Sequence, residues 1–446
     1  MRPILLVSLL TLGLTVFGQT TDEDLKIYSD HPRLLLTKQR IRTLRRERER
    51  KSDRWQQFEL LLKGNAQFPE AGFARALQYQ VSGEADACGK AVAGAGNDVR
   101  QSALVFDWCQ EALSAAQKNQ LAARLKTATE SKSTTYSGVR DRAYAAIALA
   151  DTAGFDAAPV LAQIVQTWWR KQVAPELENG KRVIGPVDLY AVLELLHALR
   201  DNTGVELREN ATRYFKQIPA AQLLSYYPAT YPTPENDFHI PVFTGKGEPD
   251  LRVAAISRIA ELSMVAYDNN AVESQFLQGW LLHDRFALRA AFGAPYEFLW
   301  ANPYQPGLSY FHMPLRLHDE RTGRLFLRSS WEEDATWLAY FDHQAQLFEG
   351  GQIKLIALEN RKSPLPIGEA VVLQGKSSMQ FTVETDSPPN LFILGLKPRS
   401  PYRIEVDDEE LNEGTTDVGG VLSVLSSRKD QRGVRIVPAM MAVSNE

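Results

Sequence analysis

The sequence predicts an α+β protein with two domains, in which helices come first and an antiparallel β-sandwich follows. At roughly 150 residues per domain, 446 residues suit about two or three domains. Apolar residues recur every three or four positions across residues 28–290, which is typical of amphipathic helices. After about residue 305 they alternate with a period of two, as in strands. We place the boundary near Asn302–Gly307, so the expected domains are residues 19–304 and 305–446.

The helical pattern is clearest in residues 101–126, where Ser114 can cap the second of two helices. Similar patterns follow at 138–151, 157–173, 185–201, 207–216, 251–267 and 272–290. Many antiparallel helices of this length predict helical pairs arranged in a toroid or a solenoid. No strict repeat period is visible in the sequence.

The strand pattern occupies the last third of the chain. Expected strands are 324–331, 335–342, 353–358, 370–375, 379–385, 401–407, 421–427 and 433–439. Many short strands separated by turn residues predict an antiparallel sandwich.

The N-terminus predicts a cleavable signal peptide over residues 1–18. Arg2 supplies a positive charge, residues 4–17 form a short apolar run, and Gly18 is small enough to precede the cut. The run is too short for a comfortable membrane span, and no later stretch approaches the roughly 20 apolar residues of a spanning helix. We therefore expect a secreted or periplasmic protein that is not inserted in the membrane after cleavage.

The charge balance argues against nucleic acid as a partner. Lys and Arg total 50 and Asp and Glu total 54, for a net charge of −4, whereas nucleic-acid binding needs a basic face. The basic stretch 38–54 fits either a polyanion patch or the solvated face of the first helix, and we favour the second. Cys88 and Cys109 fit either a disulfide or two buried thiols.

Residues 218–250 interrupt the helical pattern and are expected to form a long loop dense in Tyr, Pro and Gly. Loops of this length are often functional. Rings such as Tyr227 and Tyr231 can stack on the apolar faces of sugars, or they can pack the loop onto its own domain.

Four segments resemble the heparinase II/III-like proteins. They are HPRLLLT (31–37), ALVFDWCQEALSAAQKNQLAARL (103–125), PYEFLWANPYQPG (295–307) and GRLFLRSSWEEDATWLAYFDHQ (323–344). The resemblance implies an incomplete (α/α) toroid followed by an antiparallel β-sandwich, with a cleft between them. It also implies a polysaccharide lyase that acts on uronic-acid polymers, so that the partner would be an acidic polysaccharide or oligosaccharide.

Such a lyase removes the C5 proton of a uronate and expels the C4 oxygen, which requires a base, an acid and a group that neutralises the carboxylate. The resemblance places His343 where the family has H-x-H-x-D, but Ala345 stands at the second His, and of that motif only His343 and a displaced Glu349 remain. It makes Tyr190, on the helix after Pro186, the counterpart of the family's catalytic Tyr. No metal or other cofactor is expected.

The remaining candidates would bind the substrate or assist the chemistry. Arg140 and Arg142 stand where the family carries an Asn-His pair, and a guanidinium can neutralise a carboxylate through two hydrogen bonds. His239 is a third catalytic candidate, in a polar loop beside Asn236, and Arg252 is a further anion contact. The predicted catalytic set is therefore Tyr190, His239 and His343, and the substrate-binding set is Arg140, Arg142, Tyr227, Tyr231, Asn236 and Arg252.

Two functions remain open, with a third less favoured. The first is an exported lyase, and the second is a carbohydrate-binding or structural protein on the same scaffold without full catalytic power. The departures from the family's motifs favour the second. A glycoside hydrolase would need a converging pair of carboxylates, and Glu248 and Asp250 on one loop need not converge.

Overall fold

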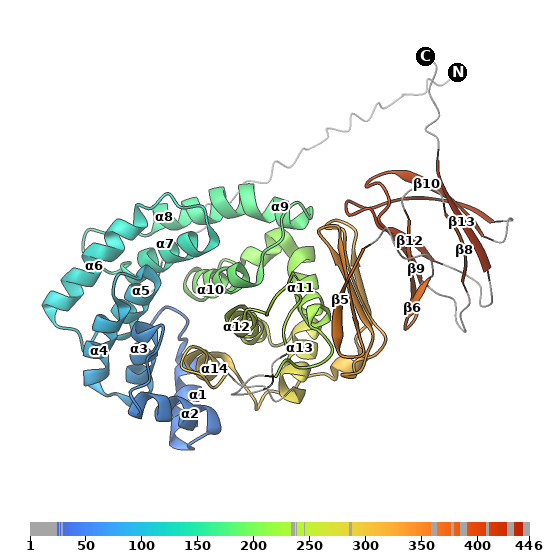
Figure 1. The fold of residues 1–446 in the computed structure, drawn as a ribbon. Coiled ribbons are helices and arrows are strands. Elements are labelled where there is room, and N and C mark those ends of the chain that lie inside the picture. The colour runs from blue at the N-terminus through green and yellow to red at the C-terminus, as the bar shows by residue number, and fades with distance from the viewer. Residues whose placement is uncertain are drawn as a thin grey trace, which may run out of the picture.

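The computed structural model describes residues 25, 27, 30–232, 237, 239–244, 246–284, 288–357, 364–375, 379–383, 390–406, 410–425 and 432–439. The predicted signal peptide and Asn236 lie outside this part of the chain. The described residues divide into a helical region followed by β-sheets, in the order that the sequence predicts (Figure 1).

The helical region contains helices of very different lengths. The α-helices are α1 (Lys38–Glu49), α2 (Asp53–Lys63), α3 (Ala71–Ser82), α4 (Ala85–Ala95), α5 (Val99–Trp108), α6 (Ala115–Thr129), α7 (Tyr136–Ala148), α8 (Ala158–Ala162), α9 (Ala174–Glu178), α10 (Pro186–Thr203), α11 (Thr212–Ser225), α12 (Leu251–Tyr267), α13 (Val272–His283) and α14 (Ala294–Trp300). A π-helix, η1 (Gln163–Val173), joins α8 to α9, and 3₁₀ turns occur at η2 (Leu207–Ala211) and η3 (Tyr310–His312).

Local signals in the sequence explain several helix ends. Ser114 caps α6 as predicted, because its hydroxyl accepts from the backbone N–H of Gln117 and the Gln117 side chain accepts from the N–H of Ser114. Asp250 caps α12 through its carboxylate, which accepts from the backbone N–H groups of Arg252 and Val253. Gly204 ends α10 in the left-handed conformation, with φ of 73°.

Contacts between helices close on themselves. Helix α3 packs on α5, α5 on α7, α7 on α10, α10 on α12, α12 on α14, and α14 returns to α3. The remaining helices, such as α4, α6 and α11, pack around these six (Figure 1). The inner helices are rich in small and apolar residues, and α7 and α10 each bury most of their length.

The segment before α1 packs across the C-terminal ends of the inner helices. Leu34, Leu35 and Leu36 are almost fully buried. The carboxylate of Asp107, at the end of α5, accepts from the backbone N–H groups of Arg33 and Leu34, both at 2.8 Å. The HPRLLLT sequence therefore closes this end of the helical domain.

The β-region contains three sheets. The first is a meander, β1 (Arg316–Asp319), β2 (Arg324–Arg328), β3 (Trp337–Phe341), β4 (Gln344–Glu349) and β5 (Gln352–Ile356). The second has the order β12-β9-β7-β6, from β6 (Leu365–Ile367), β7 (Ala370–Gln374), β9 (Asn390–Leu394) and β12 (Leu422–Leu425). The third has the order β11-β10-β13-β8, from β8 (Met379–Val383), β10 (Pro401–Val406), β11 (Glu410–Thr415) and β13 (Arg432–Pro438).

The first sheet joins the two regions because each of its two faces packs into a different hydrophobic core. Phe326, Trp337 and Phe348 belong to the core that the helices share. Leu325 and Leu338, which alternate with them along the strands, belong to a core shared with the second sheet. The strand period of two thus gives one sheet two apolar faces.

The structure corrects three expectations. Residues 218–225 are the end of α11 and not loop, since Pro219 is accommodated inside that helix. Strands β7 and β9 pair in parallel, so the β-region is not wholly antiparallel. Strand β4 completes the hairpin after Phe341, and the sequence pattern did not predict it or the strands β1, β6, β9 and β11.

Cys88 and Cys109 form a disulfide, which resolves the alternative left open by the sequence. Among the described residues, none of the helices combines the length and the apolar character that a bilayer span requires.

Candidate functional site

A groove runs between the helical domain and the first sheet. Its volume is about 290 Å³, and it is lined by the start of α10, by α11, by the loop at Pro241 and by strands β1–β3. Polar groups from both sides reach it, including the amides of Gln217 and Gln222 and the guanidinium of Arg324. The groove is therefore a place where both regions can contact one ligand.

Arg324 is the one Lys or Arg among the described residues that line this groove, and Asp319 and Asp342 line it as well. Its strand partner Asp319 is paired instead with Arg321, whose Nε donates to Oδ1 at 3.0 Å. Arg321 also donates to the carbonyl of Glu178 at 2.7 Å and so ties the sheet to the helical domain. Within the described residues, no carboxylate oxygen lies within 4.0 Å of the Arg324 guanidinium, which leaves that group available to an anion.

A buried network of charges fills the centre of the inner helices. Glu194 of α10 is fully buried, and its carboxylate accepts from Arg100 at 2.6–3.0 Å and from Arg140 at 2.8 Å. Arg140 also binds Asp141 at 2.7 Å, and Arg100 donates to Glu70 at 2.9 Å. Because each guanidinium is already paired with carboxylates, this network holds helices α5, α7 and α10 together.

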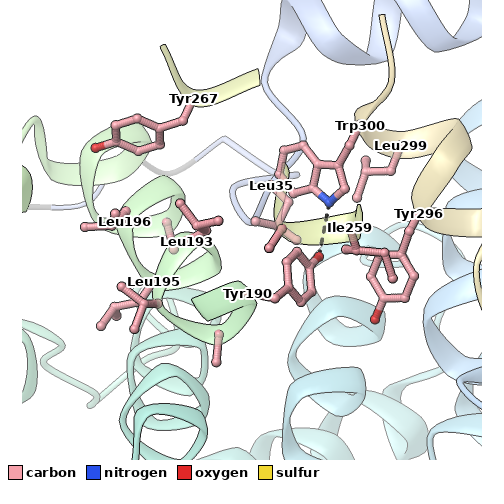
Figure 2. Close-up of a cluster of buried hydrophobic side chains, with 14 of the residues drawn as sticks. Leu35, Tyr190, Leu193, Leu195, Leu196, Ile259, Tyr267, Tyr296, Leu299 and Trp300 are labelled. Carbon is pink, nitrogen blue, oxygen red and sulfur yellow. Dashed lines mark hydrogen bonds between the residues drawn. The ribbon is translucent and has the colours of Figure 1, made fainter. Parts of the chain in front are cut away.

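Tyr190 lies in the aromatic core beside this network. Its hydroxyl accepts a hydrogen bond from the Trp300 indole at 3.1 Å, and its ring meets Tyr296 edge-on (Figure 2). Burial and the nearby Glu194 carboxylate raise the pKa of Tyr190 well above its ordinary value, although Arg100 opposes them. A hydroxyl with a raised pKa stays protonated and so does not supply a base, and its burial leaves it little access to a polymer.

His239 is held by a buried carboxylate. Its Nδ1 lies 2.6 Å from Oδ1 of Asp284, and its ring meets Trp280 edge-on. Asp284 is also 3.4 Å from Arg258, which itself lies 3.8 Å from Glu261. An Asp that bonds one ring nitrogen fixes the orientation of a histidine and leaves the other nitrogen for chemistry.

His343 is at the tip of a hairpin and not in a strand. Asp342 and His343 have φ of 49° and 57°, which two-residue hairpins require at both central positions. The His343 side chain is exposed, while Asp342 beside it lines the groove. His343 is thus near the groove along the chain, but it is not among the residues that form its wall.

The other predicted binding residues occupy separate places. Arg142 is buried and donates to the carbonyl of Ser131 at 2.9 Å. Tyr227 is buried between the regions, where its hydroxyl donates to Gln346 at 2.7 Å. Tyr231 donates to Glu248, and Arg252 is exposed with its guanidinium 5.2 Å above the Phe292 ring.

The structure therefore brings Tyr190 and Arg140 together through Glu194, whereas His239 and His343 lie in two other environments. Arg100, Glu194, Arg258, Glu261 and Asp284 were missed at the sequence level. One signal could have found most of them: charged residues inside otherwise apolar helices, as in LYAVLELLHAL and ISRIAELSM. In the described part of the chain, no group of three or more His, Cys, Asp or Glu is placed to hold a metal ion.

Comparisons with known proteins do not identify a family for this chain. No protein-family model and no curated protein matches the chain. Among solved structures, it is similar to one named glycoside hydrolase, with 10% identity and a TM-score of 0.29, over 83% of this chain and 71% of that one. That similarity carries no inference about activity, and the resemblance to heparinase II/III-like proteins stays a prediction.

Proposed function

We propose that this protein binds acidic, uronate-containing glycans in the groove between its helical domain and its first sheet. The observation that carries the proposal is Arg324, a half-buried cation without a carboxylate partner among the described residues, in a groove with amides from α11. A guanidinium binds a carboxylate through two parallel hydrogen bonds. Amide side chains and the ring of Phe341 supply the polar and apolar contacts that sugars use.

We also propose that the helical region is an incomplete (α/α) toroid. It is supported by the closed order of contacts from α3 through α14. Export is also proposed, and the Cys88–Cys109 disulfide supports it because disulfides persist in oxidising compartments.

The test is binding of polygalacturonate, alginate and a neutral glucan to the full chain by calorimetry. We expect the acidic polymers to bind and the neutral glucan not to bind. Arg324→Gln should weaken binding about tenfold, since a hydrogen-bonded charge is lost. Arg316→Gln is the matched control, because Arg316 is an exposed cation on the neighbouring strand and does not line the groove. Equal affinity of Arg324→Gln and the wild type rejects this site.

A second candidate, β-elimination by a lyase, is favoured by one observation, the His239–Asp284 pair. With Nδ1 engaged by Asp284, Nε2 of His239 can accept a proton. Its loop continues into Pro241, which lines the groove. Elimination leaves an unsaturated sugar that absorbs ultraviolet light, so product formation can be followed directly.

We expect slow product formation or none, and loss of any activity in His239→Ala. Turnover that survives His239→Ala, Tyr190→Phe and His343→Ala removes all three predicted catalytic residues from consideration. Binding without turnover supports the binding function alone.

A further inference from the structure

A second pocket lies at the other end of the inner helices. Its volume is about 300 Å³, and it is lined by α1 and by the C-terminal ends of α10, α12 and α14. Leu189 lines the groove and Asp201 lines this pocket; along α10 these positions are about 18 Å apart. The two sites are therefore separate.

Three arginines line the pocket, and two of them serve the helix ends. Arg54 donates to the carbonyls of Glu297 and Ala301, at the end of α14, and pairs with Glu47 at 3.1 Å. Arg200 donates to the carbonyl of Tyr267 at 2.6 Å, at the end of α12, and binds Asp201. These bonds satisfy carbonyl groups that a helix leaves without partners.

Arg40 is different from the other two. Its guanidinium lies 4.4 Å above the Trp300 ring and donates to the carbonyl of Leu35. Within the described residues, no carboxylate oxygen is within 4.0 Å of it. Burial lowers the pKa of Arg40 to about 10, against the attraction of Asp201, so the cation is held in a site that gives it little solvation.

Asp201 also lines the pocket, and one of its two oxygens lacks a hydrogen-bond donor among the described residues. One of its oxygens accepts from Arg200, whereas Oδ2 is buried and has no hydrogen-bond partner among the described residues. A buried acceptor without a donor is costly, and a ligand hydroxyl would satisfy it. The pocket is thus lined by the Arg40 guanidinium, part of which is bound to Leu35, and by the Asp201 carboxylate, whose enclosed Oδ2 has to turn toward a ligand hydroxyl to bond it.

We infer that this pocket binds a small hydroxylated oxyanion, of the size of one sugar acid or sugar phosphate, with Arg40 on the anion and Asp201 on a hydroxyl. Its volume is at the lower end of ligand pockets and is large enough for a single sugar residue. The amides of Gln39 and Gln305 also line it and can bond further hydroxyls. The inference does not depend on the proposed function of the groove.

The test is calorimetry of the full chain with glucuronate, glucose 1-phosphate and glucose at constant ionic strength. We expect saturable binding of glucuronate or glucose 1-phosphate, and the tighter of the two identifies the anion that the site takes. Glucose should not bind. Binding of none of the three, or of glucose as tightly as the anions, overturns the inference.

Variants locate the site. Arg40→Gln should weaken anion binding about tenfold, while Arg42→Gln, an exposed cation on the same helix, should not. Asp201→Asn should also weaken binding, and it provides the decision if Arg40→Gln fails to fold. Wild-type affinity in both Arg40→Gln and Asp201→Asn overturns the assignment.

Discussion

Glu194 and Glu261 are both fully buried glutamates of the inner helices, and they differ in their partners. Glu194 accepts from two arginines at hydrogen-bond distance. Glu261 has Arg258 at 3.8 Å, and Arg258 is shared with Asp284. Burial raises the pKa of Glu261 to about 7, although the charge of Arg258 opposes this. The two sites show that equal burial can come with different pairing geometry, which sets how strongly a partner's charge opposes the cost of burial.

The largest effect is expected at Glu194. Glu194→Gln leaves Arg100 and Arg140 buried without their shared carboxylate and should lower the free energy of unfolding by about 3–5 kcal/mol. Urea unfolding followed by circular dichroism measures it. Glu59→Gln is the control, since Glu59 pairs with Lys63 on an exposed helix face and should contribute less than about 0.5 kcal/mol. If both variants lose a similar free energy of unfolding, the buried pairing of Glu194 does not stabilise the fold more than an exposed ion pair does.

A smaller, pH-dependent effect is expected at Glu261. With its pKa raised to about 7 in the folded state, Glu261 keeps its proton there while the unfolded chain releases it above about pH 4.5. Its contribution is therefore complete at low pH and declines as pH rises through 7, by roughly 3 kcal/mol at most.

Glu261→Gln abolishes that decline. The variant should gain on the wild type between pH 5 and pH 8 when unfolding is measured in urea at both pH values. A difference between the two proteins that does not change with pH would mean that Glu261 is ionised in the fold.

The smallest effect is expected at His31. Here the buried carboxylate, Asp107, has a histidine as its partner, and the histidine is the group whose pKa is shifted. Burial lowers the pKa of His31, but the hydrogen bond from Nδ1 to Asp107, at 2.5 Å, and the charge of Asp107 outweigh it, so the pKa is raised. The stabilisation is complete below about pH 6.5 and is lost as pH rises through the folded pKa.

His31→Gln should therefore cost about 1–2 kcal/mol at pH 6 and less at pH 9. Unfolding midpoints of both proteins at the two pH values measure this. A cost that is equal at pH 6 and pH 9 would show that His31 acts through packing and not through its charge.

We could predict from local patterns the order of the helical and β-regions, the cap at Ser114 and the span of α12, because these depend on local periodicity and on side chains within one turn. It also predicted the strands β2 and β3 closely. It did not predict that Pro219 lies inside α11, since the surrounding packing outweighs the local preference of proline.

Which charged residues meet depends on how the helices and sheets pack together. Arg100, Arg140 and Glu194 come from three helices far apart in sequence, and His239 finds Asp284 across 45 positions. The guanidinium of Arg324 is available to a ligand anion because Asp319 binds Arg321 instead. The order of residues does not show which of the two arginines Asp319 binds. Local patterns specify elements through contacts within a turn or a strand, whereas a site depends on the separations that packing imposes on residues from different elements.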